Sequence, residues 1–382
     1  MTPGLLGMAA KGDSTRSAIP AALAAERWFF PAAALYGAVA VPASVYGMLD
    51  GEQHIPGLAT RAAHAHELLF GYALAVVAGY LTGRASAARL ALLLGFWLAA
   101  RVSYLMAPYG VPAALLNTGF AAAMALTVAP KLIRAAKKWR NKMLGPLIVA
   151  LAIAVSVFHL ALVVESPRFQ LLALRESVVM LALLMLFMGG RIIAPAVAGA
   201  IERSGGTMEA RVQPRIEGAL LLVMLVAVLG TACPRADEVA GVSLIAAGVL
   251  AAVRLLRWRL WHCRSRTDLL CLGAGYGWLA AGLILLGSAR LGALPIATAT
   301  HGITVGALGS LTTAVMGRVH LVKCRVRPES AGRTMSLIAV AMSAAALVRI
   351  AGGGTAGTLW LAAALWSMGL LLLLGLFRRF RQ

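Results

Sequence analysis

The sequence predicts an all-α protein, a polytopic membrane bundle of about 12 transmembrane helices. Apolar residues make up 60% of the 382 residues, charged residues make up 13%, and the mean hydropathy is +0.84. Soluble domains are typically about 45–50% apolar and about 25% charged, so the composition excludes that class. A β-barrel would show alternating strands of about ten residues, and no such pattern is present in the sequence.

A helix needs about 20 apolar residues to cross the hydrocarbon core of a bilayer. The stretches that reach this length are, in chain order, 28–49, 64–83, 87–107, 111–130, 143–164, 171–190, 216–233, 237–256, 268–288, 295–316, 334–352 and 357–377. We expect 28–377 to form a single transmembrane domain, with 1–27 as an N-terminal cytoplasmic segment and 378–382 as a cytoplasmic tail. The longest loops are predicted near 191–215 and 317–333.

The net charge of +21 is explained by topology. With the N-terminus inside, most of the 35 Lys and Arg residues fall in cytoplasmic segments, and the opposite loops hold Arg61, Arg168, Arg235 and Arg290. This is the positive-inside pattern, which places both termini in the cytoplasm. The expected partner of the basic surface is therefore the lipid bilayer, and nucleic acid is excluded.

Histidines from distant parts of the chain fall toward the outer side of this topology. They are His54 in the first outer loop, and His64, His66, His159 and His301 near the outer ends of their spans. An imidazole inside a bilayer is costly and usually serves a partner or a function, and it is the commonest metal ligand. The placement predicts a metal or haem site near the outer face.

Other polar residues also lie toward the outer side of the membrane. Arg101, Arg175 and Arg349 lie in the outer halves of their spans, as do Tyr104, Asn117 and Glu176. Such groups normally face the bundle interior. They either lock helices together by ion pairs or line a shared polar chamber, and both interpretations stay open.

The most informative motif is His64-Ala-His66-Glu67 at the start of the second span. On a helix, His64, Glu67 and Gly71 share one face while His66 points nearly opposite. The two histidines therefore serve different partners, or the helix end is unwound. Glu67 is placed to accept a hydrogen bond from a ligating imidazole and so fix its tautomer.

His301 heads a ridge of Gly302, Gly306 and Gly309, which permits close approach of another helix or of a flat macrocycle. His159, in the fifth span, is either a ligand or a histidine bonded to a neighbouring carbonyl.

The chain resembles the NnrS family of bacterial membrane proteins over most of its length. The resemblance rests on an ordered set of motifs: His64-Ala-His66-Glu67-Leu68-Leu69-Phe70-Gly71, Arg140-Asn141, His159, Met188-Gly189-Gly190-Arg191-Ile192-Ile193, Gly275-Tyr276-Gly277-Trp278, His301-Gly302-Ile303-Thr304-Val305-Gly306-Ala307-Leu308-Gly309 and Val315-Met316-Gly317-Arg318. Two departures, Tyr80-Leu81-Thr82-Gly83 and Ala194-Pro195, lie on the inner side, away from the histidines.

The resemblance implies a multi-spanning protein of the bacterial inner membrane that contains haem and copper and is linked to nitric oxide stress and denitrification. It implies haem b, with copper, held by His64, His66, His301 and His159. The metal ligands would be His64, His66 and His301, with Glu67 behind them. Cationic side chains would pair with the haem propionates; the candidates are Arg101, Arg175 and Arg349.

Alternative functions are a secondary transporter or a protein that hands haem or copper to an oxidase. Against a transporter, the inner half shows no acidic residue to couple ions, and Asp268 is interpreted as a helix cap. No phosphate loop, nucleophile elbow or carboxylate pair indicates a hydrolase or a transferase. Redox activity is compatible with the sequence, and whether nitric oxide is substrate or signal stays open.

Overall fold

The part of the chain that the structure describes is helical, apart from loops and one pair of two-residue strands. The computed structural model describes residues 22–50, 54–208 and 211–380. Among these residues, 12 helical spans are long and apolar enough to cross a membrane. The predicted N-terminal segment falls largely on residues 1–21, which lie outside the described residues.

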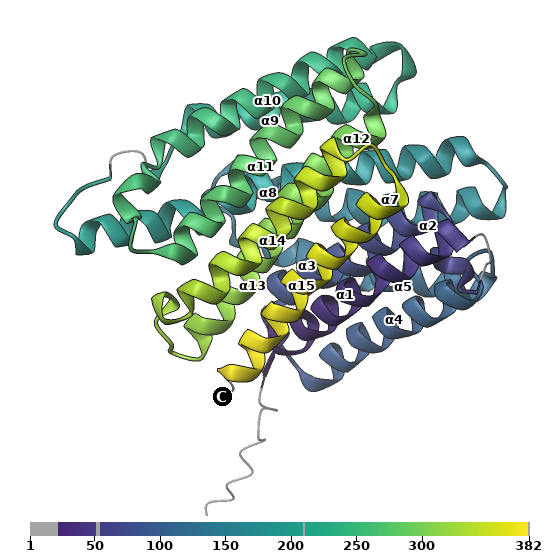
Figure 1. Cartoon of the computed structure of the whole chain (residues 1–382), viewed down its shortest axis with the longest axis horizontal. Coiled ribbons are helices and arrows are strands. Elements are labelled where there is room, and N and C mark those ends of the chain that lie inside the picture. The colour runs from purple at the N-terminus through teal and green to yellow at the C-terminus, as the bar shows by residue number, and fades with distance from the viewer. Residues whose placement is uncertain (1–21, 51–53, 209–210, 381–382) are drawn as a thin grey trace, which may run out of the picture.

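The spans follow the predicted order (Figure 1). Ten of the helices that make them up are α1 (Glu26–Asp50), α4 (Ala87–Met106), α5 (Val111–Ala135), α7 (Leu144–Val163), α8 (Pro167–Arg203), α9 (Pro214–Ala232), α10 (Asp237–Arg257), α11 (Thr267–Arg290), α14 (Gly332–Ala351) and α15 (Ala356–Arg379). The fifth span includes the short α6 (Trp139–Lys142) before α7. Helices satisfy all their backbone hydrogen bonds internally, which is what a bilayer requires. The prediction of a polytopic helical bundle is confirmed.

Two spans are interrupted by a π-helical segment directly after a histidine. The second span consists of α2 (Arg61–His66), η2 (Glu67–Ala73) and α3 (Leu74–Thr82). The tenth consists of α12 (Ile296–His301), η6 (Gly302–Ala307) and α13 (Leu308–Lys323). A π-helical turn inserts one extra residue into the helical repeat and is often found at functional sites.

Short elements join the spans. They are the 3₁₀ turns η1 (Pro56–Leu58), η4 (Pro234–Ala236), η5 (Leu260–Cys263) and η7 (Pro328–Ala331), and the strands β1 (Leu23–Ala24) and β2 (Arg84–Ala85). The strands pair antiparallel, with Leu23 opposite Ala85 and Ala24 opposite Arg84.

The two long loops that the sequence predicted are shorter than expected. Helix α8 continues to Arg203 and α13 to Lys323, well past the predicted ends of their spans. Pro195 lies inside α8 without ending it. The error arose because the apolar runs stop where the membrane is expected to stop, whereas helical hydrogen bonding continues beyond them.

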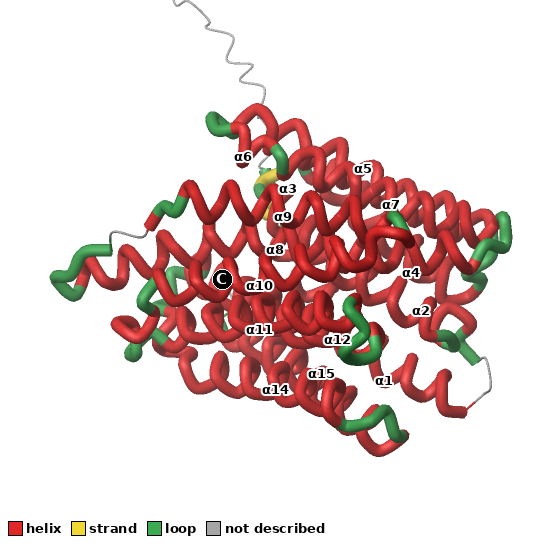
Figure 2. The backbone as a smooth tube through the Cα atoms, turned by 90° about the horizontal axis from the view of Figure 1, so that it is seen from above, coloured by secondary structure: helices red, strands yellow, loops and turns green. Residues whose placement is uncertain are grey.

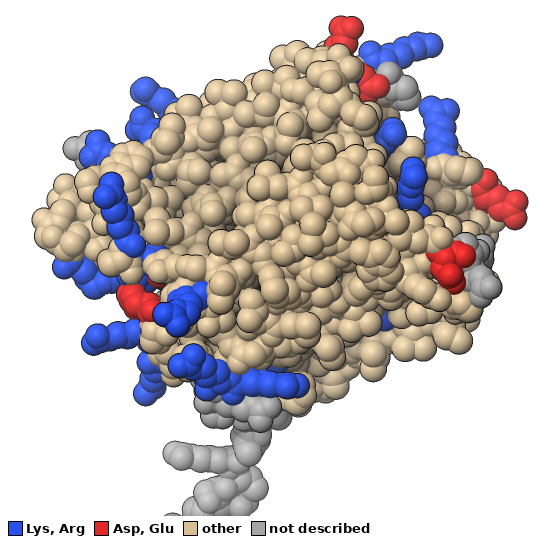
Figure 3. All heavy atoms as spheres, in the orientation of Figure 1, with Lys and Arg blue, Asp and Glu red and all other residues tan. Residues whose placement is uncertain are grey.

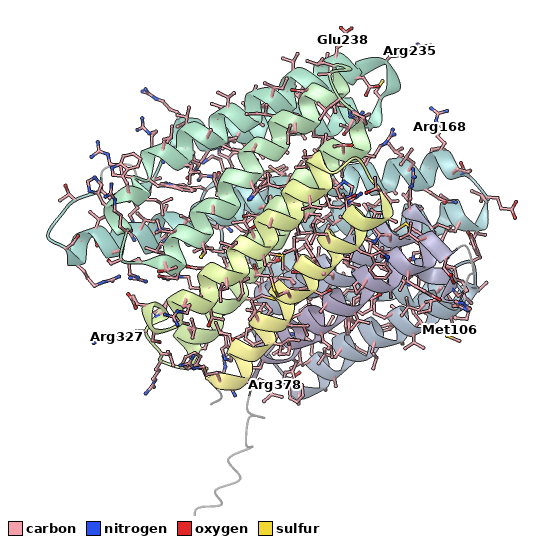
Figure 4. The ribbon with its side chains drawn as sticks, in the orientation of Figure 1. Met106, Arg168, Arg235, Glu238, Arg327 and Arg378 are labelled. Carbon is pink, nitrogen blue, oxygen red and sulfur yellow. The ribbon has the colours of Figure 1, made fainter. Side chains whose placement is uncertain are left out.

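The two ends of the bundle differ in the residues they carry. Met106, Arg168, Arg235 and Glu238 lie at one end, here called the histidine end, while Arg327 and Arg378 lie at the opposite, basic end (Figure 4). Charged side chains gather toward the ends of the visible face, and a broad band between them is almost free of charge (Figure 3). That band is the surface expected to face lipid.

The first and last spans are neighbours. Helix α1 packs along α15, and α15 packs along α14 (Figure 1). Seen from above, α14 and α15 lie along one side, whereas α5, α6 and α9 lie toward the other (Figure 2). Helix α8 contacts α7, α9 and α11. One continuous hydrophobic core runs from Ala25 to Phe377, so helices from both halves of the chain surround the same interior.

Candidate functional site

Two histidines meet inside the bundle near the histidine end. His66, the last residue of α2, and His159 of α7 face each other with 3.1 Å between their Nε2 atoms. Their side chains are almost wholly buried, at 0% and 2% exposure. The other ring nitrogen of His66, Nδ1, donates a hydrogen bond to Glu67 Oε1 over 2.8 Å.

Glu67 is the centre of the polar network around this pair. Its Oε1 also accepts a hydrogen bond from Arg101 Nη1 of α4, and its Oε2 accepts one from the Tyr36 hydroxyl of α1. Arg101 donates in turn to Asn117 Oδ1 of α5. Asn117 Nδ2 donates to the Ala113 carbonyl at 2.8 Å. A buried carboxylate is tolerable only when it is paired in this way, and five spans contribute to the arrangement.

Aromatic rings enclose the imidazoles. The His66 ring stacks on Tyr104 with 3.7 Å between centroids and 16° between planes. Phe158 and Phe70 lie at 4.8 and 5.2 Å from the same ring. The rings exclude water, which strengthens every electrostatic interaction within the cluster.

The hydrogen bond to the Glu67 carboxylate favours one tautomer of His66, with its proton on Nδ1. With the proton on Nδ1, the Nε2 atom of neutral His66 presents a lone pair to His159. If His159 donates to that lone pair through Nε2–H, its Nδ1 is an acceptor, and this buried atom has no hydrogen-bond partner in the described chain. A cation between the two Nε2 atoms would instead let His159 carry its proton on Nδ1.

The π-helical segment η2 positions Glu67 within this network. Glycine is required at position 71, because a Cβ there would lie 2.8 Å from Arg101 Nη1 and 3.0 Å from Tyr36 Cε1. The Trp97 ring donates from Nε1 to the Gly71 carbonyl over 2.9 Å. The segment is therefore fixed by the side chains that hold Glu67.

His64 and His301 form a second group with Arg349, on the other side of α2. Here His64 Nδ1 lies 2.6 Å from Ser44 Oγ of α1. His301 Nδ1 donates to the Ala297 carbonyl at 2.7 Å, and Arg349 Nη2 of α14 donates to His301 Nε2 at 3.3 Å. His64, His301 and Arg349 are half-buried. We call this set the rim group and the His66–His159–Glu67–Arg101 set the buried network.

The structure does not gather the predicted ligands into one site. His64 and His301 lie in the rim group, His66 in the buried network, and no three His, Cys, Asp or Glu side chains among the described residues are placed to hold a metal ion. Arg175 belongs to neither group, since its electrostatic neighbours are Asp237 and Arg290. His54 lies 3.5 Å from Asp50 at the end of α1.

Comparison with known proteins gives one result. The family model described as NnrS protein matches residues 23–380, nearly the whole chain. The chain belongs to the NnrS family. Neither the curated proteins nor the solved structures gave a match.

Three motifs of the NnrS resemblance meet at the basic end, away from the histidines. Arg254 donates from Nη2 to Glu217 Oε1 at 2.8 Å and from Nη1 to the Leu186 carbonyl at 3.0 Å. Arg140 Nη2 lies 3.5 Å from Glu217 Oε2.

Gly190 allows this arrangement, since a Cβ there would lie 2.0 Å from Arg254 Nη2. Tyr276 lies against Gly189. These motifs join spans five to nine by ion pairs and close packing.

The remaining motifs of the NnrS resemblance also pack helices together. The glycine ridge after His301 lies against other helices, with Gly302 facing Gly282, Gly306 facing Trp278 and Gly309 facing Trp366, so it leaves no face for a macrocycle. Asp268 accepts hydrogen bonds from Arg266 and Arg318 and is fully buried. The interpretation of Asp268 as a helix cap was wrong: it is the acceptor of a buried ion pair that includes the last motif.

Sequence reasoning missed two residues of these groups, Tyr36, which donates to Glu67, and Ser44, which contacts His64. Tyr36 and Ser44 lie in the first span, which carries no histidine and no charged residue between Trp28 and Leu49. The feature of the sequence that could have indicated them is a hydroxyl side chain on an apolar helix, and such side chains are common in membrane spans. The sequence alone could not distinguish these two residues from the others.

Proposed function

We propose that this NnrS-family chain is a copper-binding protein of the bacterial inner membrane, that His66 and His159 are its copper ligands, and that it acts in nitric oxide metabolism. The observation that carries the proposal is the pair of Nε2 atoms facing each other at 3.1 Å within a wholly buried network. The link to nitric oxide and denitrification comes from the role described for the family.

The buried network fits a copper ion. Two imidazole nitrogens bound to one metal at about 2.0–2.1 Å lie about 2.8–3.4 Å apart when the angle between them is between a right angle and a tetrahedral angle. The pair in this chain falls within that range. In metal sites a ligating histidine generally donates its other ring N–H to a carboxylate or a carbonyl, and Glu67 supplies that carboxylate for His66. Imidazole is also a ligand that suits copper. Bound copper would supply one-electron chemistry and open coordination positions for a small ligand.

The buried network does not fit haem. Two axial imidazoles lie on opposite faces of a porphyrin, and His66 and His159 leave no room for one between them. Tyr104 and Phe158 already cover the His66 ring. Arg101 is engaged by Glu67 and Asn117, so it is not free for a propionate.

The rim group is the place where this chain would hold haem b. The Nδ1 atom of His64 contacts Ser44, and its Nε2 has no hydrogen-bond partner among the described residues, so it is available to an iron. Arg349 is half-buried and bonded to neutral His301 rather than to a carboxylate. It would pair with a propionate.

The orientation that goes with this proposal places the basic end in the cytoplasm. Helices α1 and α15 begin and end there, respectively (Figure 1). By the positive-inside rule both termini are then cytoplasmic and the histidine end is periplasmic.

The test is metal analysis of the purified full-length protein after loading with copper. We expect about one copper per chain, and a loss of most of it in His66→Ala and in His159→Ala. His262→Ala is the matched control, because His262 is exposed in η5 at the basic end. Full copper content in both buried-network variants would refute the assignment.

The same sample distinguishes the alternatives. Copper retained through gel filtration with a chelator supports a resident cofactor, whereas copper lost at that step supports a handover protein. Uptake of a labelled substrate into vesicles by copper-free protein would favour a transporter instead.

A further inference from the structure

A pocket lies between the two halves of the chain, away from both histidine groups. Helices α3, α8, α11 and α13 surround it, and its volume is about 90 Å³. Its lining includes Ala73, Leu184, Leu308 and Val315. Because α3 and α13 run from the histidine end to the basic end, the pocket extends from the middle of the bundle toward the basic end. We call it the median pocket.

The upper limit of the median pocket is set by the two π-helical segments. Ala73 is the last residue of η2, and Leu308 directly follows η6. A hydrogen bond of 2.7 Å between the Tyr72 hydroxyl and Thr312 Oγ1 joins the two spans at this level. Each interrupted span therefore has a histidine above its π-helical segment and pocket-lining residues below it.

The lower part of the pocket is more open. Ala73, Leu184 and Leu308 are buried, whereas Tyr80 and Ile192, nearer the basic end, are half-buried. The pocket is therefore less enclosed toward the basic half of the bundle than at the level of the two π-helical segments.

The lining determines which molecules can bind. Nearly all of the pocket surface is apolar. The hydroxyl of Thr312, one of its few polar groups, is already engaged by Tyr72 and by the Leu308 carbonyl at 2.6 Å. A water molecule needs two to four polar partners, so an apolar cavity stays dry, and cavities of about 150 Å³ bind benzene or xenon. Charged or hydrogen-bonding ligands are excluded.

We propose that the median pocket is a binding site for small uncharged apolar molecules, of the size of dissolved gases. The unfilled space forgoes packing contacts for the side chains around it, and a small apolar molecule would supply them. The proposal does not depend on copper or haem, because none of the histidine groups lines the pocket.

The test uses xenon as the probe and ¹²⁹Xe saturation-transfer NMR on the full-length protein in detergent. We expect a bound-xenon resonance distinct from that of xenon in micelles. Val315→Phe fills the pocket and should remove at least nine-tenths of that signal. Val340→Phe is the matched control, because Val340 lies on α14 with 64% of its surface exposed, and it should leave the signal unchanged.

A second variant guards against misfolding. Ala73→Leu fills the pocket from a different helix, and each variant is compared with wild type by gel filtration and helical circular dichroism. Loss of the xenon signal in a folded filling variant supports the proposal. Absence of the signal from the wild type, or its survival in both filling variants, overturns it.

Discussion

His64 and His66 are separated by one residue, yet they belong to surroundings of opposite character. His66 is fully buried, has a carboxylate on one ring nitrogen and faces a second imidazole on the other. His64 is half-buried and contacts a serine hydroxyl. The two histidines of this His-x-His pair therefore belong to two different sites. The groups that contact their ring nitrogens, rather than the histidines themselves, distinguish the two sites.

The comparison extends to the arginines of the two groups. Arg101 pairs with a buried carboxylate, whereas Arg349 donates to a neutral imidazole. Removing one partner of a buried ion pair leaves an uncompensated charge in a low dielectric. Changes in the buried network should therefore cost much more stability than changes in the rim group.

The largest effect is expected for Arg101→Leu. It leaves Glu67 buried without its guanidinium partner, which should cost about 3–5 kcal/mol and lower the thermal unfolding midpoint in detergent. Arg235→Leu, in an exposed position at the same end, is the control. An equal midpoint for the two variants would show that the buried network does not hold the spans together.

Gly190→Ala tests whether the basic end is independent of the histidines. The new Cβ would lie 2.0 Å from Arg254 Nη2 and displace it from Glu217, at a cost of about 1–3 kcal/mol. Gly218→Ala is the matched control, because a Cβ there meets nothing within 4 Å. Copper content should stay that of the wild type; a loss of copper would mean that the two ends are coupled.

Glu67→Gln keeps the shape of the buried network but removes its charge. Loss of a carboxylate behind a ligating histidine typically lowers metal affinity roughly 10–100-fold. Copper titration of the variant beside the wild type measures this shift. Unchanged affinity would exclude Glu67 from a role in metal binding.

The smallest effect is expected for His301→Gln in the rim group. It removes one hydrogen bond with Arg349, worth about 1 kcal/mol or less, and should leave copper content unchanged while any bound haem weakens. Absorbance spectroscopy and copper analysis of the same sample check both expectations. Loss of copper here would move the copper site to the rim.

The spans could be predicted because each requires about 20 apolar residues. That His64 and His66 point to nearly opposite faces of the helix followed from helical geometry. The partners could not be predicted, because His159, Arg101 and Tyr36 come from three other spans whose rotation is set by packing. Glu67 was expected to share a face with His64, and in the structure it bonds to His66, where the π-helical segment begins. Nothing in the composition of residues 67–73 indicates that segment.

The most direct test of the central claim is pulsed EPR of the copper-loaded full-length protein, which counts the imidazoles bound to Cu(II). The account predicts two imidazoles in the wild type and in His301→Gln. In His159→Ala it predicts loss of most of the Cu(II) signal, and one imidazole on any copper that remains. An identical spectrum for the wild type and His159→Ala would contradict it.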